Sequence, residues 1–115
     1  MIIEDEPLIA LNLKKLLEKK GFEVTGHAGN FEDAHTLFYA NKPDIVLSDI
    51  KLENDESGIE VVKHLKKMSN FCVMYLTSYG ADAMIEKALD TNPAAYITKP
   101  FKEIDVVFYL EGDIN

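Results

Sequence analysis

The sequence predicts an α/β fold in which helices cover both faces of a single parallel sheet. Five short apolar runs, at residues 1–3, 22–28, 44–48, 71–76 and 94–98, alternate with longer stretches of helical periodicity. This alternation is typical of βαβ units, whose strands lie parallel in one sheet. In the third run, Ile45, Val46 and Leu47 are apolar at successive positions, as expected of a strand that is covered on both sides.

Apolar residues spaced three or four apart predict a helix after each run. These helices are expected near residues 9–17, 31–38, 61–68, 84–89 and 106–110. Gly21 follows the first pattern and is expected to end that helix, because glycine readily adopts the conformation that closes a helix. Asn30 precedes the second pattern and is expected to cap its amino terminus.

Length and charge narrow the classes of function. The chain has 115 residues, which we interpret as one domain (1–115). Three residues precede Glu4 and fifteen follow Pro100, and these short ends indicate that the domain is trimmed at both ends. The formal net charge is −8, and all 12 basic residues are lysines. Direct nucleic-acid binding is not expected, since it usually needs a basic, arginine-bearing surface. No apolar run approaches the length that is needed to span a membrane. The single cysteine, Cys72, is interpreted as a core residue, and we expect a cytoplasmic protein.

Chemically active side chains follow four of the five runs. Glu4 and Asp5 follow the first, Asp49 the third, Thr77 the fourth and Lys99 the fifth. Each alone has an ordinary explanation, such as a helix cap or a solvated charge. Together they would converge at the carboxyl edge of the sheet, where ligands bind in such folds. Close carboxylates and few protein ligands favour Mg²⁺, and with a lysine and a hydroxyl they predict phosphoryl transfer onto Asp49.

The motifs "IIEDE", "DIVLSDIKL", "MYLTS" and "AAYITKPF", in this order, resemble those of receiver domains of two-component response regulators. The resemblance extends over essentially the whole chain. It implies a flavodoxin-like, doubly wound sheet of five strands in the order 2-1-3-4-5, with five helices on its two faces. It also implies Mg²⁺ as cofactor, a histidine kinase or phosphotransfer protein as phosphoryl donor, and a downstream output domain or protein as partner.

The resemblance further implies a role for each matching residue. Asp49 would be phosphorylated, and Glu4, Asp5, Asp49 and the backbone carbonyl of Lys51 would hold the metal. Thr77 would move to meet the phosphoryl group and Lys99 would pair with it. The bond between Lys99 and Pro100 would be cis, and Tyr96 would turn inward as the aromatic switch. The face that responds would be that of the fourth helix, fifth strand and fifth helix, residues 81–110.

The loop after Asp49 departs from the family pattern. A proline common in the family is missing after Leu52, and the loop to Gly58 is one residue longer than the family pattern. Its acidic residues are interpreted as a solvated rim; they are Glu53, Asp55 and Glu56. Lys51 and Tyr79 are both large, and we hypothesise that they shield an acyl phosphate from water. The histidines are interpreted as surface or boundary residues; they are His27, His35 and His64.

Three functions remain open from the sequence. The first is a phospho-accepting signalling domain that catalyses only its own phosphorylation and dephosphorylation, and is otherwise not an enzyme. The second is a degenerate receiver that signals by protein contact alone. The third is a Mg²⁺-dependent phosphatase with an aspartyl phosphate, which is disfavoured because haloacid dehalogenase-type enzymes carry a second aspartate where this chain has Lys51.

Overall fold

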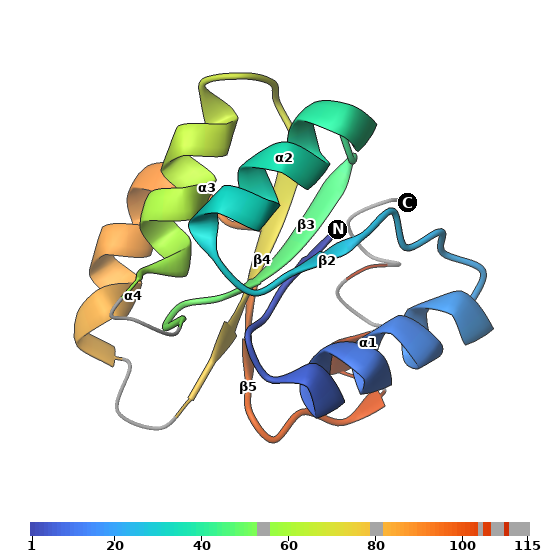
Figure 1. The fold of residues 1–115 in the computed structure, drawn as a ribbon. Coiled ribbons are helices and arrows are strands. Elements are labelled where there is room, and N and C mark those ends of the chain that lie inside the picture. Colours follow the sequence, from blue (N-terminus) through green and yellow to red (C-terminus); the bar gives the residue numbers. More distant parts are fainter. Residues whose placement is uncertain (53–55, 79–81, 104, 107–109, 111–115) are drawn as a thin grey trace.

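The computed structural model has the predicted α/β fold (Figure 1). It describes residues 1–52, 56–78, 82–103, 105–106 and 110. One parallel sheet contains five strands in the order β2-β1-β3-β4-β5, which confirms the expected topology. The strands are β1 (Ile2–Ile3), β2 (His27–Ala28), β3 (Ile45–Asp49), β4 (Cys72–Thr77) and β5 (Ala95–Thr98).

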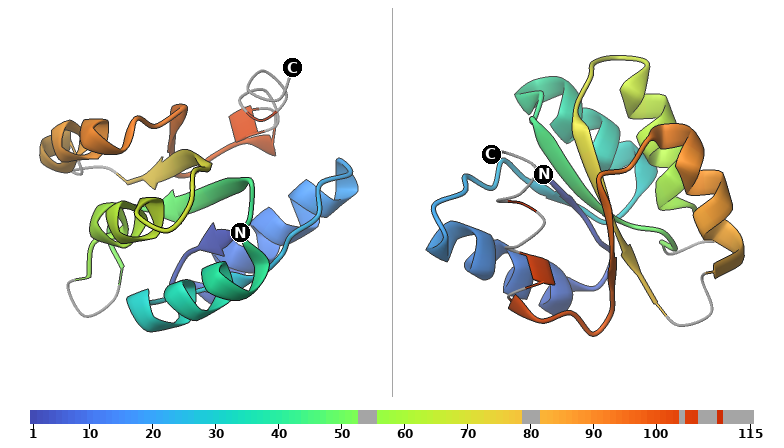
Figure 2. Two further views of the ribbon diagram at one scale, coloured as in Figure 1. Left: turned by 90° about the horizontal axis from the view of Figure 1, so that it is seen from above. Right: turned by 180° about the vertical axis from the view of Figure 1, so that it is seen from behind.

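Helices cover both faces of the sheet, as Figure 2 shows. They are α1 (Pro7–Lys19), α2 (Phe31–Asn41), α3 (Gly58–Lys66) and α4 (Asp82–Ala88), and a 3₁₀ turn, η2 (Leu89–Thr91), continues α4. The predicted fifth helix falls partly outside the described residues. Within it, residues 103, 105, 106 and 110 are helical.

The core consists of two apolar layers, one on each side of the sheet. Buried side chains of α2, α3 and α4 pack on one face of β1, β3 and β4, with Phe38 and Tyr75 among the largest. On the other face, α1 packs with Val106 and Leu110 against β3, β4 and β5. Cys72 is half-buried at the margin of this second layer, so it is less enclosed than the sequence predicted. A sheet covered on both sides requires strands that are apolar throughout, as β3 and β4 are.

Local sequence signals define the ends of the helices. After α1, the Gly21 amide donates to the Glu18 carbonyl (3.1 Å) and the Phe22 amide donates to the Leu17 carbonyl (3.0 Å). With Gly21 at φ 91°, these bonds form a Schellman motif, which confirms the expected role of glycine. Before α2, the Asn30 side chain accepts a hydrogen bond from the Asp33 amide (2.9 Å), as predicted.

The strand predicted over residues 22–28 is shorter than expected. Only His27 and Ala28 pair with β1, opposite Ile2 and Ile3. Residues 22–26 instead have no strand assignment, and residues 22–25 line a cavity of about 650 Å³ together with residues 41–45. Apolar alternation indicates that a segment could form a strand. The length of that strand depends on how many backbone groups of the neighbouring strand are available for pairing. The cavity lies at the amino-terminal edge of the sheet, away from the site described below.

Helices within the described part of the chain are too short and too polar to cross a membrane.

Candidate functional site

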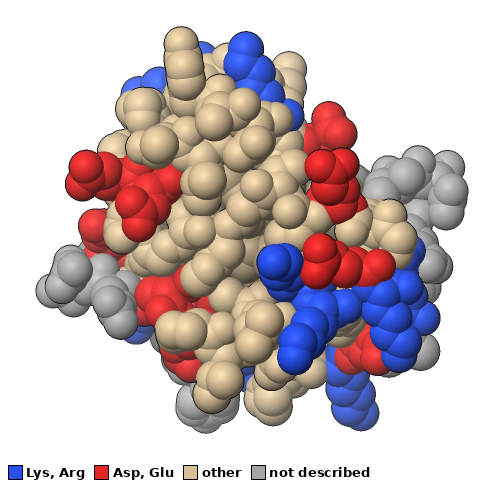
Figure 3. Space-filling view, turned by 45° about the vertical axis from the view of Figure 1, so that its right-hand side comes forward, with Lys and Arg blue, Asp and Glu red and all other residues tan. Residues whose placement is uncertain are grey.

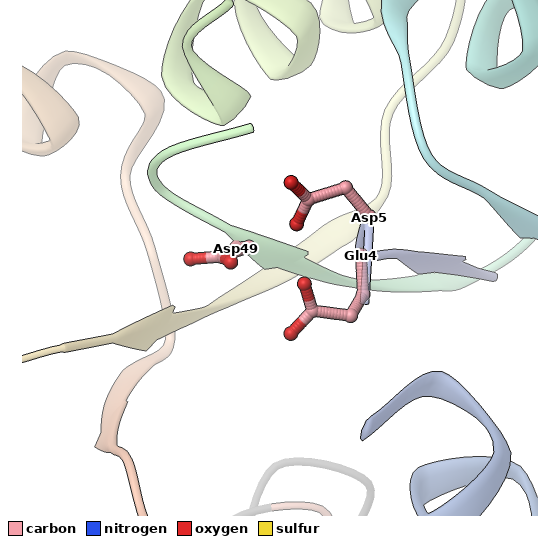
Figure 4. A group of neighbouring side chains, drawn as sticks. All are labelled: Glu4, Asp5 and Asp49. Atoms are coloured by element: carbon pink, nitrogen blue, oxygen red, sulfur yellow. The ribbon is translucent and has the colours of Figure 1, made fainter. Parts of the chain in front are cut away.

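Three carboxylates meet at the carboxyl edge of the sheet (Figure 4). Glu4 and Asp5 directly follow β1. Asp49 is the last residue of β3, which pairs with β1 in the sheet. A ligand oxygen from each of the three lies within 4.8 Å of the others. Glu4 is fully buried and Asp49 is 6% exposed, whereas Asp5 is half-buried. The structure therefore brings together the three acidic side chains that the sequence placed at strand ends.

Lys99 joins this group from the end of β5. Its ammonium donates to Glu4 Oε1 at 2.5 Å and to Asp49 Oδ2 at 2.9 Å. The lysine side chain is 14% exposed, so solvent screens these two ion pairs only weakly. The Lys99 amide also donates to the Thr77 carbonyl at 2.7 Å. The peptide bond between Lys99 and Pro100 is cis, the isomer that the resemblance implied.

The negative charge of the site favours binding of a further cation. Burial, together with the neighbouring carboxyl groups of Asp5 and Asp49, raises the pKa of Glu4 to about 7, even though Lys99 opposes this rise. Burial alone would lower the pKa of Lys99, but its bonds to Glu4 and Asp49 outweigh burial and raise that pKa. One ammonium thus leaves the three carboxylates incompletely neutralised.

The donor set fits Mg²⁺. The three side chains offer only oxygen ligands, and Mg²⁺ takes one or two carboxylates while keeping several waters. A Glu4 carboxyl with a raised pKa is the group whose ionised form an added divalent cation would stabilise. Glu4, Asp5 and Asp49 are the residues that would hold the ion. The carbonyl of Lys51, the fourth predicted ligand, belongs to a described residue whose side chain is exposed.

Thr77 is the last residue of β4 and is 5% exposed. The β3–β4 register pairs Asp49 with Leu76, so Thr77 lies one residue beyond Asp49 on the neighbouring strand. The β4–β5 register pairs Thr77 with Thr98, the residue before Lys99. Thr77 thus lies at the end of β4, between the end of β3, which carries Asp49, and the end of β5, which Lys99 follows.

The predicted switch residue Tyr96 connects β5 to α4. It is half-buried, and its hydroxyl donates to the Ile85 carbonyl at 3.4 Å. Its ring stacks on that of Tyr75, with the centroids 6.1 Å apart. Tyr75 is fully buried, and its hydroxyl shares a 2.7 Å hydrogen bond with the Thr91 hydroxyl after α4. Both rings therefore connect the sheet to the α4 side of the molecule.

The loop between β3 and α3 is closed by its own backbone. Lys51 and Ser57 form an antiparallel bridge, and the Leu52 amide donates to the Glu56 carbonyl at 2.9 Å. Of the acidic residues interpreted as a solvated rim, Glu53 and Asp55 lie outside the described residues. Glu56 has a more specific role, because its carboxylate accepts a 2.7 Å hydrogen bond from the Phe31 amide. The negative charge thereby sits at the amino terminus of α2, where the helix dipole favours it.

Gly58, the first residue of α3, lies directly against the backbone of Asp49. A β-carbon at this position would lie 1.7 Å from the Asp49 carbonyl oxygen and 2.7 Å from Ser48 Oγ. The Gly58 amide donates to the Ile50 carbonyl at 2.7 Å, and the Ser48 hydroxyl donates to the Asp49 carbonyl at 3.0 Å. The sequence indicated Gly58 only as a loop glycine. Its place at the start of the helical pattern was the one available signal of a close contact.

All three histidines lie at the surface or its boundary, as the sequence indicated, and one of them, His27, also contacts the site. His35 and His64 are half-buried, and their rings lie 5.1 Å apart between α2 and α3. His27 has an exposed side chain, but its Nε2 lies 2.6 Å from the backbone carbonyl oxygen of Glu4. Tyr79, paired with Lys51 in the shielding hypothesis, lies outside the described residues.

Charged side chains are unevenly distributed over the surface. Figure 3 shows a broad uncharged area at the centre of the visible face, with acidic groups along its margins and lysines both along the top and at the lower right. Among the exposed apolar side chains are two on α1, Leu8 (74% exposed) and Leu11 (44% exposed). The lysines near the end of α1 include Lys19 and Lys20, both of which lie within 4 Å of Glu103.

Family comparison agrees with this geometry. The response regulator receiver domain family matches residues 1–111. The chain belongs to this family. It is similar to the chemotaxis protein CheY of Thermotoga maritima (32% identical over 108 residues, covering 93% of this chain and 89% of that protein). It is also similar to the transcriptional regulatory protein PdtaR of Mycobacterium tuberculosis (32% identical over 111 residues, covering 96% of this chain and 54% of that protein).

Solved receiver domains share the fold closely. The signal receiver domain of a modulated diguanylate cyclase from Desulfovibrio desulfuricans G20 matches with a TM-score of 0.87 at 31% identity, covering 96% of this chain and 87% of that one. The PhyR receiver domain of Erythrobacter litoralis matches with a TM-score of 0.83 at 32% identity, covering 98% and 86%. This receiver domain spans about half the length of several curated relatives, such as 54% of PdtaR and 43% of the sensory transduction protein LytT of Bacillus anthracis.

Proposed function

We propose that this receiver domain accepts a phosphoryl group on Asp49 in a Mg²⁺-dependent reaction. The observation that carries the proposal is the Asp49 carboxylate at the edge of the sheet, 2.9 Å from the Lys99 ammonium and grouped with Glu4 and Asp5. A nucleophilic carboxylate beside a fixed cation, with acidic groups positioned for a second cation, is what transfer of a phosphoryl group requires. The donor is the phosphohistidine of a histidine kinase or of a phosphotransfer protein.

In the proposed reaction, an oxygen of Asp49 forms a bond to phosphorus as the bond from phosphorus to the donor imidazole nitrogen breaks. The electron pair of that bond stays on the imidazole, and the product on this chain is an acyl phosphate. Bound Mg²⁺ would supply charge neutralisation at the phosphoryl oxygens. Lys99 holds Asp49 before the reaction and provides positive charge for the incoming phosphoryl group. Glu4 and Asp5 would hold the cation, and the Thr77 hydroxyl is the proposed hydrogen-bond donor to the product.

The proposed output is a change in the α4–β5 face. Tyr96 connects these two elements through its bond to Ile85, so a shift of Thr77 toward the phosphoryl group would change the space available to the tyrosine. A partner that binds only one arrangement shifts the population by its difference in affinity. The partner is an output domain or protein. PhyR of Bartonella quintana, a relative, is described as an anti-anti-sigma factor, and this description supports a protein as partner.

One experiment separates the three functions. The protein is incubated with Mg²⁺ and a small acyl-phosphate donor, and its intact mass is measured. A single stable phosphoryl adduct that Asp49→Asn lacks supports the proposal, with catalysis limited to the domain's own phosphorylation and dephosphorylation. Repeated turnover of phosphate esters would instead indicate a phosphatase, and the absence of any adduct would indicate signalling by contact alone. The cytoplasmic location remains a prediction of the sequence.

A further inference from the structure

We propose that His27, from the edge strand β2, is a positioning residue for the acidic cation site. The inference rests on the proposed function. His27 acts through the backbone rather than through a contact with the ion, because its ring hydrogen-bonds the carbonyl of Glu4 and thereby fixes the peptide group that joins Glu4 to Asp5. Removal of this bond is expected to weaken binding of Mg²⁺ to the resting protein.

The end of β2 holds both polar groups of Glu4's backbone. The Glu4 amide donates to the Ala28 carbonyl at 2.8 Å, and the Glu4 carbonyl oxygen lies 2.6 Å from His27 Nε2. A β-carbon on Gly29, two residues after His27, would lie 3.4 Å from the α-carbon of Asp5. Residues 27–29 therefore hydrogen-bond the backbone of Glu4 and lie close beside that of Asp5.

The chemistry of the contact fixes its direction. A carbonyl oxygen can only accept a hydrogen bond, so Nε2 of His27 must carry the hydrogen. A neutral His27 is thus restricted to its Nε2–H tautomer, and a protonated one donates in the same way. In either form the ring opposes rotation of the Glu4–Asp5 peptide plane.

That peptide plane lies between two predicted cation ligands. Figure 4 shows the side chains of Glu4 and Asp5 leaving the chain in different directions near the end of β1, with Asp49 beside them. Glu4 is additionally held by Lys99, at 2.5 Å. The Asp5 carboxyl group hydrogen-bonds that of Glu4, so its direction depends on Glu4 and on the peptide group that joins the two residues. Groups that orient metal ligands affect affinity although they do not touch the metal.

The change in Mg²⁺ affinity on substitution of His27 distinguishes this role from that of an ordinary surface histidine. The His27 side chain is exposed, and a single hydrogen bond contributes a net free energy that corresponds to about a two- to ten-fold change in an equilibrium constant. A histidine without a role would give no change in Mg²⁺ affinity. The difference is measurable by titration.

The test uses two substitutions at His27 and one matched control. His27→Phe keeps an aromatic ring and removes the donor, whereas His27→Gln keeps a side-chain N–H that can reach a carbonyl. His35→Phe is the same change at a histidine outside the site. The Mg²⁺ dissociation constant of each unphosphorylated protein is measured at pH 8 by calorimetry, and the amide resonance of Asp5 is followed by NMR during the titration.

We expect His27→Phe to bind Mg²⁺ about two- to ten-fold more weakly, with a displaced Asp5 amide resonance. His27→Gln is expected to recover most of the affinity, and His35→Phe to match the parent protein. Equal affinity of the parent and His27→Phe would overturn the inference and leave the proposed function intact. So would a loss that His27→Gln does not reduce, since bulk rather than the donor would then matter. Failure of the parent protein itself to bind Mg²⁺ would overturn both.

Discussion

Replacement of Gly58 by alanine should displace the proposed phosphorylation site, Asp49, by a steric effect alone. The added β-carbon would lie 1.7 Å from the Asp49 carbonyl oxygen, whereas ordinary contacts begin at 3.4 Å. The start of α3 and the end of β3 must therefore separate by the difference, 3.4 − 1.7 = 1.7 Å. Because the obstacle is backbone on one side and the first turn of a helix on the other, no side-chain rotation relieves it.

The expected cost is a loss of about 2 kcal/mol in the free energy of unfolding. Overpacking contributes about 1–3 kcal/mol, and the hydrogen bond from the Gly58 amide to Ile50, 2.7 Å long, contributes about 1 kcal/mol if it breaks. The better helix propensity of alanine returns up to about 1 kcal/mol. Asp49 should also move away from Lys99, so the rate of phosphorylation by an acyl-phosphate donor should fall.

Gly29→Ala is the matched control. Gly29 also lies beside the site, but its added β-carbon would approach no atom closer than 3.4 Å. We expect its stability, measured by urea denaturation, to change by less than about 0.5 kcal/mol. If Gly58→Ala is as stable as Gly29→Ala and is phosphorylated as fast as the parent, the contact between α3 and Asp49 does not constrain the site, and this reasoning is wrong.

Three further predictions follow from the contacts of the site. Since burial raises the pKa of Glu4 to about 7 from 4.5, the folded protein binds more protons than the unfolded chain between these values. In the absence of metal, the urea midpoint of unfolding should therefore fall as pH rises from 4.5 to 7, and Mg²⁺ should oppose this fall. If Glu4→Gln has the same pH profile as the parent protein, Glu4 is not the group responsible. Glu56→Ala should remove the acceptor of the Phe31 amide and speed hydrogen exchange there by about five-fold or more, whereas protection equal to the parent's would mean that the carboxylate does not hold the amide. Tyr75→Phe should cost about 1 kcal/mol in unfolding free energy because its hydroxyl bond is buried, and Tyr96→Phe, whose bond is 3.4 Å long, should cost less; the reverse order would refute this ranking.

Much of the fold could be predicted because its signals are local. Asn30 and Gly21 define helix ends through contacts within a few residues. The continuous apolar run of β3 indicated a strand covered on both faces, and its last residue, Asp49, therefore indicated the edge at which the site lies. The convergence of Glu4, Asp5, Asp49 and Lys99 followed from strand ends and parallel pairing, and the structure shows these four side chains together.

The features that the sequence did not predict depend on contacts between distant segments. Glu56 reaches the Phe31 amide across 25 residues of sequence, and His27 reaches the Glu4 carbonyl across 23. Neither residue type nor spacing indicates such a partner, because it depends on the path of two loops. The length of β2 was overestimated for a related reason, since pairing ends where β1 offers no further residues.

The position of Lys99 would make the proposed phosphoryl acceptance dependent on complete folding. Lys99 is 95 residues from Glu4 and 50 from Asp49 along the chain, and it reaches both only after the edge strand β5 has docked on β4. Contacts of such long range form at a high entropic cost and depend on the rest of the sheet. A chain that ends before β5 would carry all three acidic residues without the ammonium that holds two of them. Reactivity of Asp49 would therefore distinguish fully folded molecules from partly folded ones.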